Sequence, residues 1–126
     1  VHIIEPAGFD LSDRALKRSG MDYLEQASLR RHVNWQAFEA DCSAAERRIV
    51  LFTTGAQTSY AAFRFEPNDV LLFGRESSGV TQEVHDRADA RLVIPMRRDR
   101  RSLNLALSVA MATGEALRQL EGFGPV

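Results

Sequence analysis

The most informative stretch of the chain is Leu72-Phe73-Gly74-Arg75-Glu76-Ser77-Ser78-Gly79, an apolar run that stops at a glycine and continues with polar and small residues. A second stretch makes the same change, where Ile94-Pro95-Met96 is followed by Ser102-Leu103-Asn104-Leu105. A buried strand that ends in this way presents backbone amide and carbonyl groups to a ligand at its carboxyl end. The two stretches therefore predict a ligand-binding edge of a sheet.

Four apolar runs predict buried strands, at residues 1–4, 49–54, 70–73 and 92–94. The runs are continuous and do not alternate with polar residues, which is typical of parallel strands covered on both faces. Helices are predicted at residues 12–19, 35–41, 82–87 and 103–120, the second capped by Asn34 and the third by Thr81. Because strands and helices alternate, the predicted class is α/β with a mostly parallel sheet flanked by helices.

Composition sets broad limits on the kind of protein. With 126 residues, 44% of them hydrophobic, the chain is expected to form a single domain over residues 1–126. A net charge of -1 excludes a uniformly basic protein that coats nucleic acid, but it does not exclude a local basic patch. The single cysteine, Cys42, cannot form an internal disulfide, which favours the cytoplasm. No run approaches the ~18 apolar residues of a membrane helix.

The beginning of the chain is unusual, since Val1-His2-Ile3-Ile4-Glu5-Pro6 has no initiator methionine and starts inside an expected strand. A fold rarely begins in the middle of a strand. We therefore expect that residues upstream of Val1 are missing from this sequence.

The last helix, residues 103–120, predicts an interface. Five of its polar side chains fall within an arc of about 100°, namely Asn104, Ser108, Glu115, Arg118 and Gln119, and Thr113 alone interrupts the apolar remainder. Most of the remaining circumference is apolar, with a row of small residues at Ala106, Ala110 and Gly114. A helix that is apolar on so many sides needs cover on more than one face. A homodimer would supply it, and a central position within one subunit is the alternative.

Three strand ends share the same change from apolar to small or polar residues, at Phe52-Thr53-Thr54-Gly55, Phe73-Gly74-Arg75-Glu76 and Ile94-Pro95-Met96. In an open parallel sheet these ends lie along one edge, where ligands bind. A small molecule there would meet backbone donors and acceptors and the apolar faces of Phe52, Ile94 and Met96. Such surroundings suit a purine.

Other kinds of site find little support in the sequence. Gly74 to Gly79 has the spacing of a phosphate-binding loop, but Val80-Thr81 follows where a lysine is required. No G-x-G-x-x-G or G-x-S-x-G motif is present. The three histidines, His2, His32 and His85, lack metal-ligand spacing, so no metal is expected. Glu76 has the chemistry of a general base, but an anchoring role for its loop is favoured.

A basic run precedes the last helix, where Arg97, Arg98, Arg100 and Arg101 flank Asp99. Such a run is usually a solvated loop. Because this one follows the proposed edge, it also suits contacts to RNA phosphates, which position an RNA without reading its bases.

Several of these motifs together resemble one known family. They are Val1-His2-Ile3-Ile4-Glu5-Pro6-Ala7-Gly8-Phe9, Gly20-Met21-Asp22-Tyr23, Leu72 to Gly79, Ile94-Pro95-Met96 with Ser102-Leu103-Asn104-Leu105, and Gly114 to Leu120. The chain resembles the SPOUT class of RNA methyltransferases along essentially its whole length. Within that class it is most similar to the tRNA (cytidine/uridine-34) 2'-O-methyltransferases.

The resemblance implies an α/β fold with a C-terminal trefoil knot that binds S-adenosyl-L-methionine. By position, the cofactor contacts would be Phe52, Gly74, Ile94, Ser102 and Leu103, and a valine at position 74 would block cofactor entry. The reaction would methylate the 2'-hydroxyl of tRNA nucleotide 34, with Arg97, Arg100 and Arg101 on the anticodon-loop backbone. The family also implies a homodimer that pairs through the last helix.

Two departures from the family pattern leave alternatives open. The family's first motif, which carries an asparagine and the catalytic arginine, would lie upstream of Val1, so the catalytic residue is unknown here and this chain alone is expected to be inactive. Ala106-Leu107 stands where Ser-Asn is frequent in the family. The alternatives are an rRNA 2'-O-methyltransferase and a non-catalytic RNA-binding module of the same fold.

Overall fold

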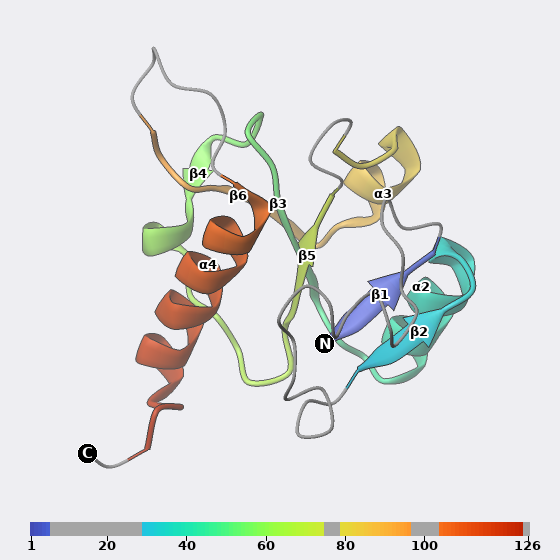
Figure 1. Ribbon diagram of the computed structural model, residues 1–126, viewed down its shortest axis with the longest axis horizontal. Coiled ribbons are helices and arrows are strands. Elements are labelled where there is room, and N and C mark those ends of the chain that lie inside the picture. The colour runs from blue at the N-terminus through green and yellow to red at the C-terminus, as the bar shows by residue number, and fades with distance from the viewer. Residues whose placement is uncertain (6–28, 75–78, 97–103, 125–126) are drawn as a thin grey trace, which may run out of the picture. The chain divides into compact units, whose positions relative to one another are not determined.

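The computed structural model describes residues 1–5, 29–74, 79–96 and 104–124 (Figure 1). The chain divides into two compact units, Val1–Ala45 and Glu46–Val126. The expected helix at residues 12–19 lies outside the described residues.

Among its described residues, the first unit contains a small parallel sheet and one helix. Strand β1 (His2–Ile4) pairs with β2 (Arg30–His32), so that His2 lies opposite Arg30 and Ile4 opposite His32. The sequence analysis missed β2, because two arginines and a histidine lack the apolar character used to recognise strands.

Helix α2 (Trp35–Ala44) follows β2 and begins where the sequence predicts. The Asn34 side chain accepts a hydrogen bond from the Ala37 N–H at 2.9 Å, which is an N-cap. The helix runs three residues beyond the predicted end at Asp41, and it buries Phe38 and Cys42.

The second unit is built on a four-stranded sheet in the order β4-β6-β3-β5. Its strands are β3 (Ile49–Phe52), β4 (Thr58–Ser59), β5 (Val70–Phe73) and β6 (Ala90–Val93), and all neighbouring strands are parallel. This confirms the predicted class, a mostly parallel sheet with helices. The short β4 was not predicted, and β3 ends at Phe52, two residues before the predicted end at Thr54.

The sheet is buried on both faces at its centre. Ile49, Val50 and Leu51 of β3 are fully buried, although their side chains alternate between the two faces. Val50 and Phe52 point to one face of the sheet, where they form an apolar cluster with Phe65, Leu92 and Ala112. This is why the strands read as continuous apolar runs.

Among the residues that the structure describes, this unit has two capped α-helices. Helix α3 (Gln82–Arg87) is capped by Thr81, as predicted. Helix α4 (Leu105–Leu120) is capped by Asn104, whose side chain accepts from the Ala106 N–H at 2.8 Å. Figure 1 shows α4, in orange and red, alongside the sheet, and α4 contacts β5 and the 3-10 helix η1 (Tyr60–Ala62). Within the described residues, no helix has both the length and the apolar character that a bilayer crossing requires.

Charged side chains hold the amino ends of the strands. Arg48 donates two hydrogen bonds to Asp69, at 2.7 and 2.6 Å, which joins the segments entering β3 and β5. The Asp89 carboxylate accepts from the Ile49 N–H at 2.8 Å, which joins β3 to the segment entering β6. These contacts fix the strand register, so the opposite ends of the strands are aligned as well.

Candidate functional site

The carboxyl ends of β6, β3 and β5 lie side by side. Phe52 pairs with Phe73 of β5 and with Leu92 of β6, and all three strands run in the same direction. Gly74 follows Phe73 directly, and Ile94 lies two residues beyond Leu92. The register thus brings Phe52, Gly74 and Ile94 to one edge of the sheet. Their binding of a ligand stays a prediction.

The aromatic side chains at this edge pack on one another. The Phe52 and Phe73 rings are stacked, with centroids 4.9 Å apart, and Tyr60 contacts Phe52 edge-on with centroids at 6.5 Å. Phe52 is 9% exposed and Ile94 packs against the same apolar cluster. Because the side chains of Phe52 and Ile94 pack in the core, these two residues would bind a ligand mainly through their main-chain N–H and carbonyl groups.

The segment after β3 turns back along the same edge. The Thr53 N–H donates to the Leu92 carbonyl at 2.9 Å, and the Ala56 N–H donates to the Thr53 carbonyl at 3.3 Å. Strand β4 then pairs with β6, Thr58 opposite Leu92 and Ser59 opposite Val93. This turn places Tyr60 on Phe52, a contact that the sequence analysis missed. The sequence signal for it is weak, because Thr58 is common in strands but Ser59 is not, and Tyr60 already begins a 3-10 helix.

Gly74 lies where the chain passes very close to itself. A Cβ atom at position 74 would lie 2.5 Å from the Gly79 carbonyl carbon and 2.8 Å from its Cα. Gly79 has a φ of +64°, a conformation that favours glycine. The two glycines therefore form a close backbone crossing just past β5. A valine side chain at position 74 would therefore clash with the Gly79 backbone, whether or not a ligand is bound.

The remaining predicted site residues lie outside the described residues. They are Glu76, then Arg97, Arg100 and Arg101 of the basic run, and Ser102 and Leu103. Asn104, which follows Leu103, is described, and its side chain caps α4.

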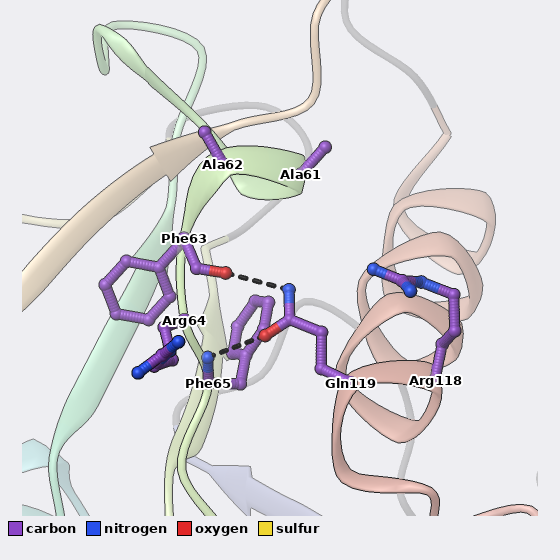
Figure 2. A pocket seen from close by; sticks show the side chains of 7 residues that line it. All are labelled: Ala61, Ala62, Phe63, Arg64, Phe65, Arg118 and Gln119. Atoms are coloured by element: carbon purple, nitrogen blue, oxygen red, sulfur yellow. Dashed lines mark hydrogen bonds between the residues drawn. The ribbon is translucent and has the colours of Figure 1, made fainter.

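A shallow hollow of about 630 Å³ lies elsewhere, between α4 and the segment that follows η1 (Figure 2). Its lining is Ala61, Ala62, Phe63, Arg64, Phe65, Arg118 and Gln119. The Gln119 side chain bridges it, accepting from the Phe65 N–H at 2.9 Å and donating to the Phe63 carbonyl at 2.8 Å. None of the predicted cofactor contacts lines this hollow, and we prefer the strand edge because main-chain groups from several strands converge there.

The acidic residue beside the hollow is held in its charged form. Hydrogen bonds from Arg118, at 2.9 and 2.8 Å, and from Gln119, at 2.8 Å, lower the pKa of Glu115 to about 2. A carboxylate with so low a pKa is a weak base, so Glu115 is a poor proton acceptor near neutral pH. Among the described residues, no group of three or more His, Cys, Asp or Glu side chains is placed to hold a metal ion.

A parallel sheet flanked by helices defines an α/β protein, and in proteins of this class ligands bind beyond the carboxyl ends of the strands. The sequence model of the SpoU rRNA Methylase family matches residues 1–114. The chain belongs to this family of RNA methylases.

Individual relatives agree with this assignment. The chain is 54% identical, over 98% of its length, to a tRNA (cytidine(34)-2'-O)-methyltransferase of Beijerinckia indica subsp. indica, of which it covers 78%. It superposes with a TM-score of 0.87 and 43% identity on a structure described as giving insights into the 2-OH methylation of C/U34 on tRNA, covering 96% of this chain and 78% of that one.

A third relative was solved with a ligand. This is the AdoMet-bound rRNA methyltransferase from Sinorhizobium meliloti, with a TM-score of 0.74 and 28% identity. The match covers 82% of this chain and 40% of that one. S-adenosylmethionine (AdoMet) is therefore the ligand bound in one structural relative of this chain.

Proposed function

We propose that this protein is an S-adenosylmethionine-dependent methyltransferase that modifies the ribose 2'-hydroxyl of nucleotide 34 in tRNA, a cytidine or a modified uridine. The observation that carries the proposal is the 54% identity, over nearly the whole chain, to a tRNA (cytidine(34)-2'-O)-methyltransferase. The structural match at a TM-score of 0.87 supports the same substrate.

The strand edge suits the adenosyl part of the cofactor. Main-chain groups at Phe52, Gly74 and Ile94 would bind it, and Ser102 and Leu103 would complete the site. The Phe52–Phe73 stack supports the edge from the core, with the centroids 4.9 Å apart. When bound, the cofactor would supply the methyl group, which is bonded to its positively charged sulfonium sulfur. The protein's own part is to hold the ribose hydroxyl in line with that group, because alignment removes much of the entropic barrier.

The RNA is expected to contact the basic run. Arg97, Arg100 and Arg101 would hold the backbone of the anticodon loop, since guanidinium groups bind phosphates through paired hydrogen bonds. The resemblance also implies that the C-terminal segment forms a trefoil knot, and it assigns no catalytic side chain within this chain. A tRNA substrate would place the protein in the cytoplasm.

The active form is proposed to be a homodimer. Large apolar side chains of α4 are exposed, with Leu107 at 55%, Met111 at 41% and Val109 at 38%. A second copy would remove this surface from water, which favours association by about 25 cal/mol per Å² of apolar area. We also propose that residues 1–126 act as one methyltransferase domain, because the family match runs through both compact units.

The test is methyl transfer from labelled S-adenosylmethionine to bulk tRNA by the complete gene product, followed by mapping of the modified ribose. We expect one 2'-O-methyl group at position 34. An anticodon stem-loop with 2'-deoxyribose at position 34 is the matched control and should accept no label. Transfer to another position, or to the deoxy substrate, would contradict the proposal.

An rRNA substrate is the second candidate, because the Sinorhizobium meliloti relative is an rRNA methyltransferase. That relative is 28% identical, against 54% for the tRNA enzyme, so tRNA is favoured. Parallel assays with tRNA and with deproteinised rRNA separate the two. Label in rRNA alone would select the second candidate.

A further inference from the structure

Tyr60 lies at the sheet edge of the proposed cofactor site, although it belongs to none of the sequence motifs that point to that site. Strand β4 pairs with β6 so that Ser59 lies opposite Val93. Tyr60 and Ile94 are the next residues along these two parallel strands, so both lie just beyond the carboxyl ends. Tyr60 is thus the residue that β4 brings to the edge, beside Phe52 of β3 and Ile94 of β6.

The Tyr60 ring packs on Phe52. It meets the Phe52 ring edge-on, with centroids 6.5 Å apart and an interplanar angle of 66°. Phe52 is also stacked on Phe73, with centroids 4.9 Å apart and an angle of 15°. Edge-to-face and offset-stacked arrangements are the favoured geometries of aromatic pairs. The Phe52 side chain is therefore held by aromatic partners from two different segments of the chain.

The backbone of Tyr60 is held on both sides. Before it, the Ser59 side chain caps η1 and accepts from the Ala61 N–H at 3.2 Å. After it, the Phe63 N–H donates to the Tyr60 carbonyl at 3.4 Å. The Phe63 carbonyl accepts in turn from Gln119 of α4 at 2.8 Å. A ring on a backbone that is fixed in this way supports its neighbours in one defined position.

The segment between Phe52 and Tyr60 contains the turn at residues 53–57, which follows β3 at the same edge. The Thr53 N–H is tied to a carbonyl of β6 at 2.9 Å, and the Ala56 N–H donates to the Thr53 carbonyl at 3.3 Å. The contact of Tyr60 with Phe52 closes this segment through its side chains. A segment ordered before binding loses less conformational entropy when a ligand binds.

We propose that Tyr60 is a positioning residue for the cofactor, because its ring holds Phe52 and the turn at residues 53–57 in the shape that binds the adenosyl group. This inference rests on the proposed function, since the strand edge is the proposed cofactor site. Tyr60 acts through Phe52, whose main-chain groups would contact the cofactor. The contact between the two residues is made by the rings, so the role requires an aromatic side chain and not the hydroxyl.

The test compares the complete gene product with its Tyr60→Leu and Tyr60→Phe variants. Calorimetry gives the Kd of S-adenosylmethionine, and methyl transfer to tRNA gives its KM and kcat. We expect Tyr60→Leu to raise Kd and KM about five- to tenfold, the effect of losing one favourable aromatic contact. The kcat at saturating cofactor should change by less than about twofold, because the reacting groups are untouched.

Tyr60→Phe keeps the ring, so its Kd, KM and kcat should all stay within about twofold of the unmodified values. A loss of affinity as large as that of Tyr60→Leu would show that the hydroxyl is needed, and it would overturn the positioning role. Tyr60→Met fills the space with a flexible side chain and no ring. It should behave like Tyr60→Leu, and it replaces that variant if Tyr60→Leu does not fold.

Phe63→Leu is the matched control, because Phe63 is also aromatic and packs against the same apolar cluster. Its ring contacts Phe65 and the guanidinium of Arg48, each at 5.1 Å, and Arg48 lies at the amino end of β3. This variant should bind the cofactor within about twofold of the unmodified Kd. The same Kd for Phe63→Leu and Tyr60→Leu, whether raised or unchanged, would overturn the inference.

A failure of the inference differs from a failure of the proposed function. If the unmodified gene product binds S-adenosylmethionine and methylates tRNA, while Tyr60→Leu does so with the same Kd and KM, only the role of Tyr60 is wrong. If the unmodified gene product binds no S-adenosylmethionine, the proposed function is wrong and this inference falls with it.

Discussion

At Gly74 the structure has no room for a side chain, because a Cβ atom would lie 2.5 Å from the Gly79 backbone. Moving the backbone to make room costs roughly 1–3 kcal/mol, and the displaced groups belong to the proposed cofactor edge. We expect Gly74→Ala to weaken S-adenosylmethionine binding about tenfold or more, measured by calorimetry.

Gly55 provides the matched control for this substitution. It follows β3 at the same edge, and no atom lies within 4 Å of a Cβ built there. Gly55→Ala should therefore bind the cofactor like the unmodified protein. Unchanged affinity in Gly74→Ala would show that the crossing does not shape the site.

The ionisation of Glu115 makes the stability of the folded protein depend on pH. Its pKa is lowered to about 2 in the folded protein by hydrogen bonds from Arg118 and Gln119, whereas an unfolded glutamate titrates near ~4.3. A lowered pKa stabilises the fold above ~4.3, and this contribution is lost as the pH falls from there towards 2.

The comparison is between the unmodified protein and Glu115→Gln, followed as melting temperature against pH. The difference in melting temperature between the two proteins should be largest at neutral pH and should become smaller below about pH 4.3. Arg118→Met removes the main cause of the shift and should flatten the acid limb in the same way. A difference that stays constant from pH 6 to pH 2.5 would exclude this role.

At the scale of elements, one glutamine fastens α4 to the segment between η1 and β5. Gln119 accepts from Phe65 and donates to Phe63, at 2.9 and 2.8 Å. Gln119→Leu leaves both main-chain groups without this partner, so we expect a loss of about 1–3 kcal/mol in the free energy of unfolding, measured in urea.

Gln82 of α3 is the control, because the hydrogen bond of its side chain goes to Asp86, an exposed neighbour on the same helix, at 2.7 Å. Gln82→Leu should change the free energy of unfolding by no more than about 0.5 kcal/mol. If both variants lose the same amount, the tie to α4 is not a stabilising feature.

The sequence predicts those elements whose cause is local. The strands at β3 and β5 are continuous apolar runs, and the caps at Asn34 and Thr81 are short polar side chains before a helix. β2 and β4 could not be predicted in this way. β2 is polar and is held by β1, and β4 has two residues held by β6, so both depend on partners distant in the sequence.

The candidate site also has a part that local sequence predicts and a part that it does not. The shared edge at Phe52, Gly74 and Ile94 follows from the parallel order of the strands, which the apolar runs indicate. The contact of Tyr60 with Phe52 and the crossing of Gly74 and Gly79 depend on the path of loops. Loop paths are set by the tertiary structure, so composition and spacing do not reveal them.

At the scale of the whole molecule, the exposed apolar side of α4 predicts the oligomeric state. We expect a dimer at micromolar concentration by light scattering, and a monomer for Leu107→Asp, because a buried unpaired charge opposes association. Leu107 is 55% exposed.

Val33→Asp is the matched control, since Val33 is also apolar, is 72% exposed and lies outside α4. It should leave the dimer intact. A monomeric unmodified protein at this concentration would rule out the proposed interface.

The strand order has a consequence during synthesis on the ribosome. β3, the most deeply buried strand, pairs only with β5 and β6, and both follow it in the chain. The Ile49 N–H can form its native hydrogen bond to the Asp89 carboxylate only after Asp89, 40 residues later, has been synthesised. At ~5–20 residues per second, the nascent chain carries an unprotected apolar strand for roughly 2–8 s. During that interval the exposed apolar side chains of Ile49–Phe52 favour aggregation of the growing polypeptide.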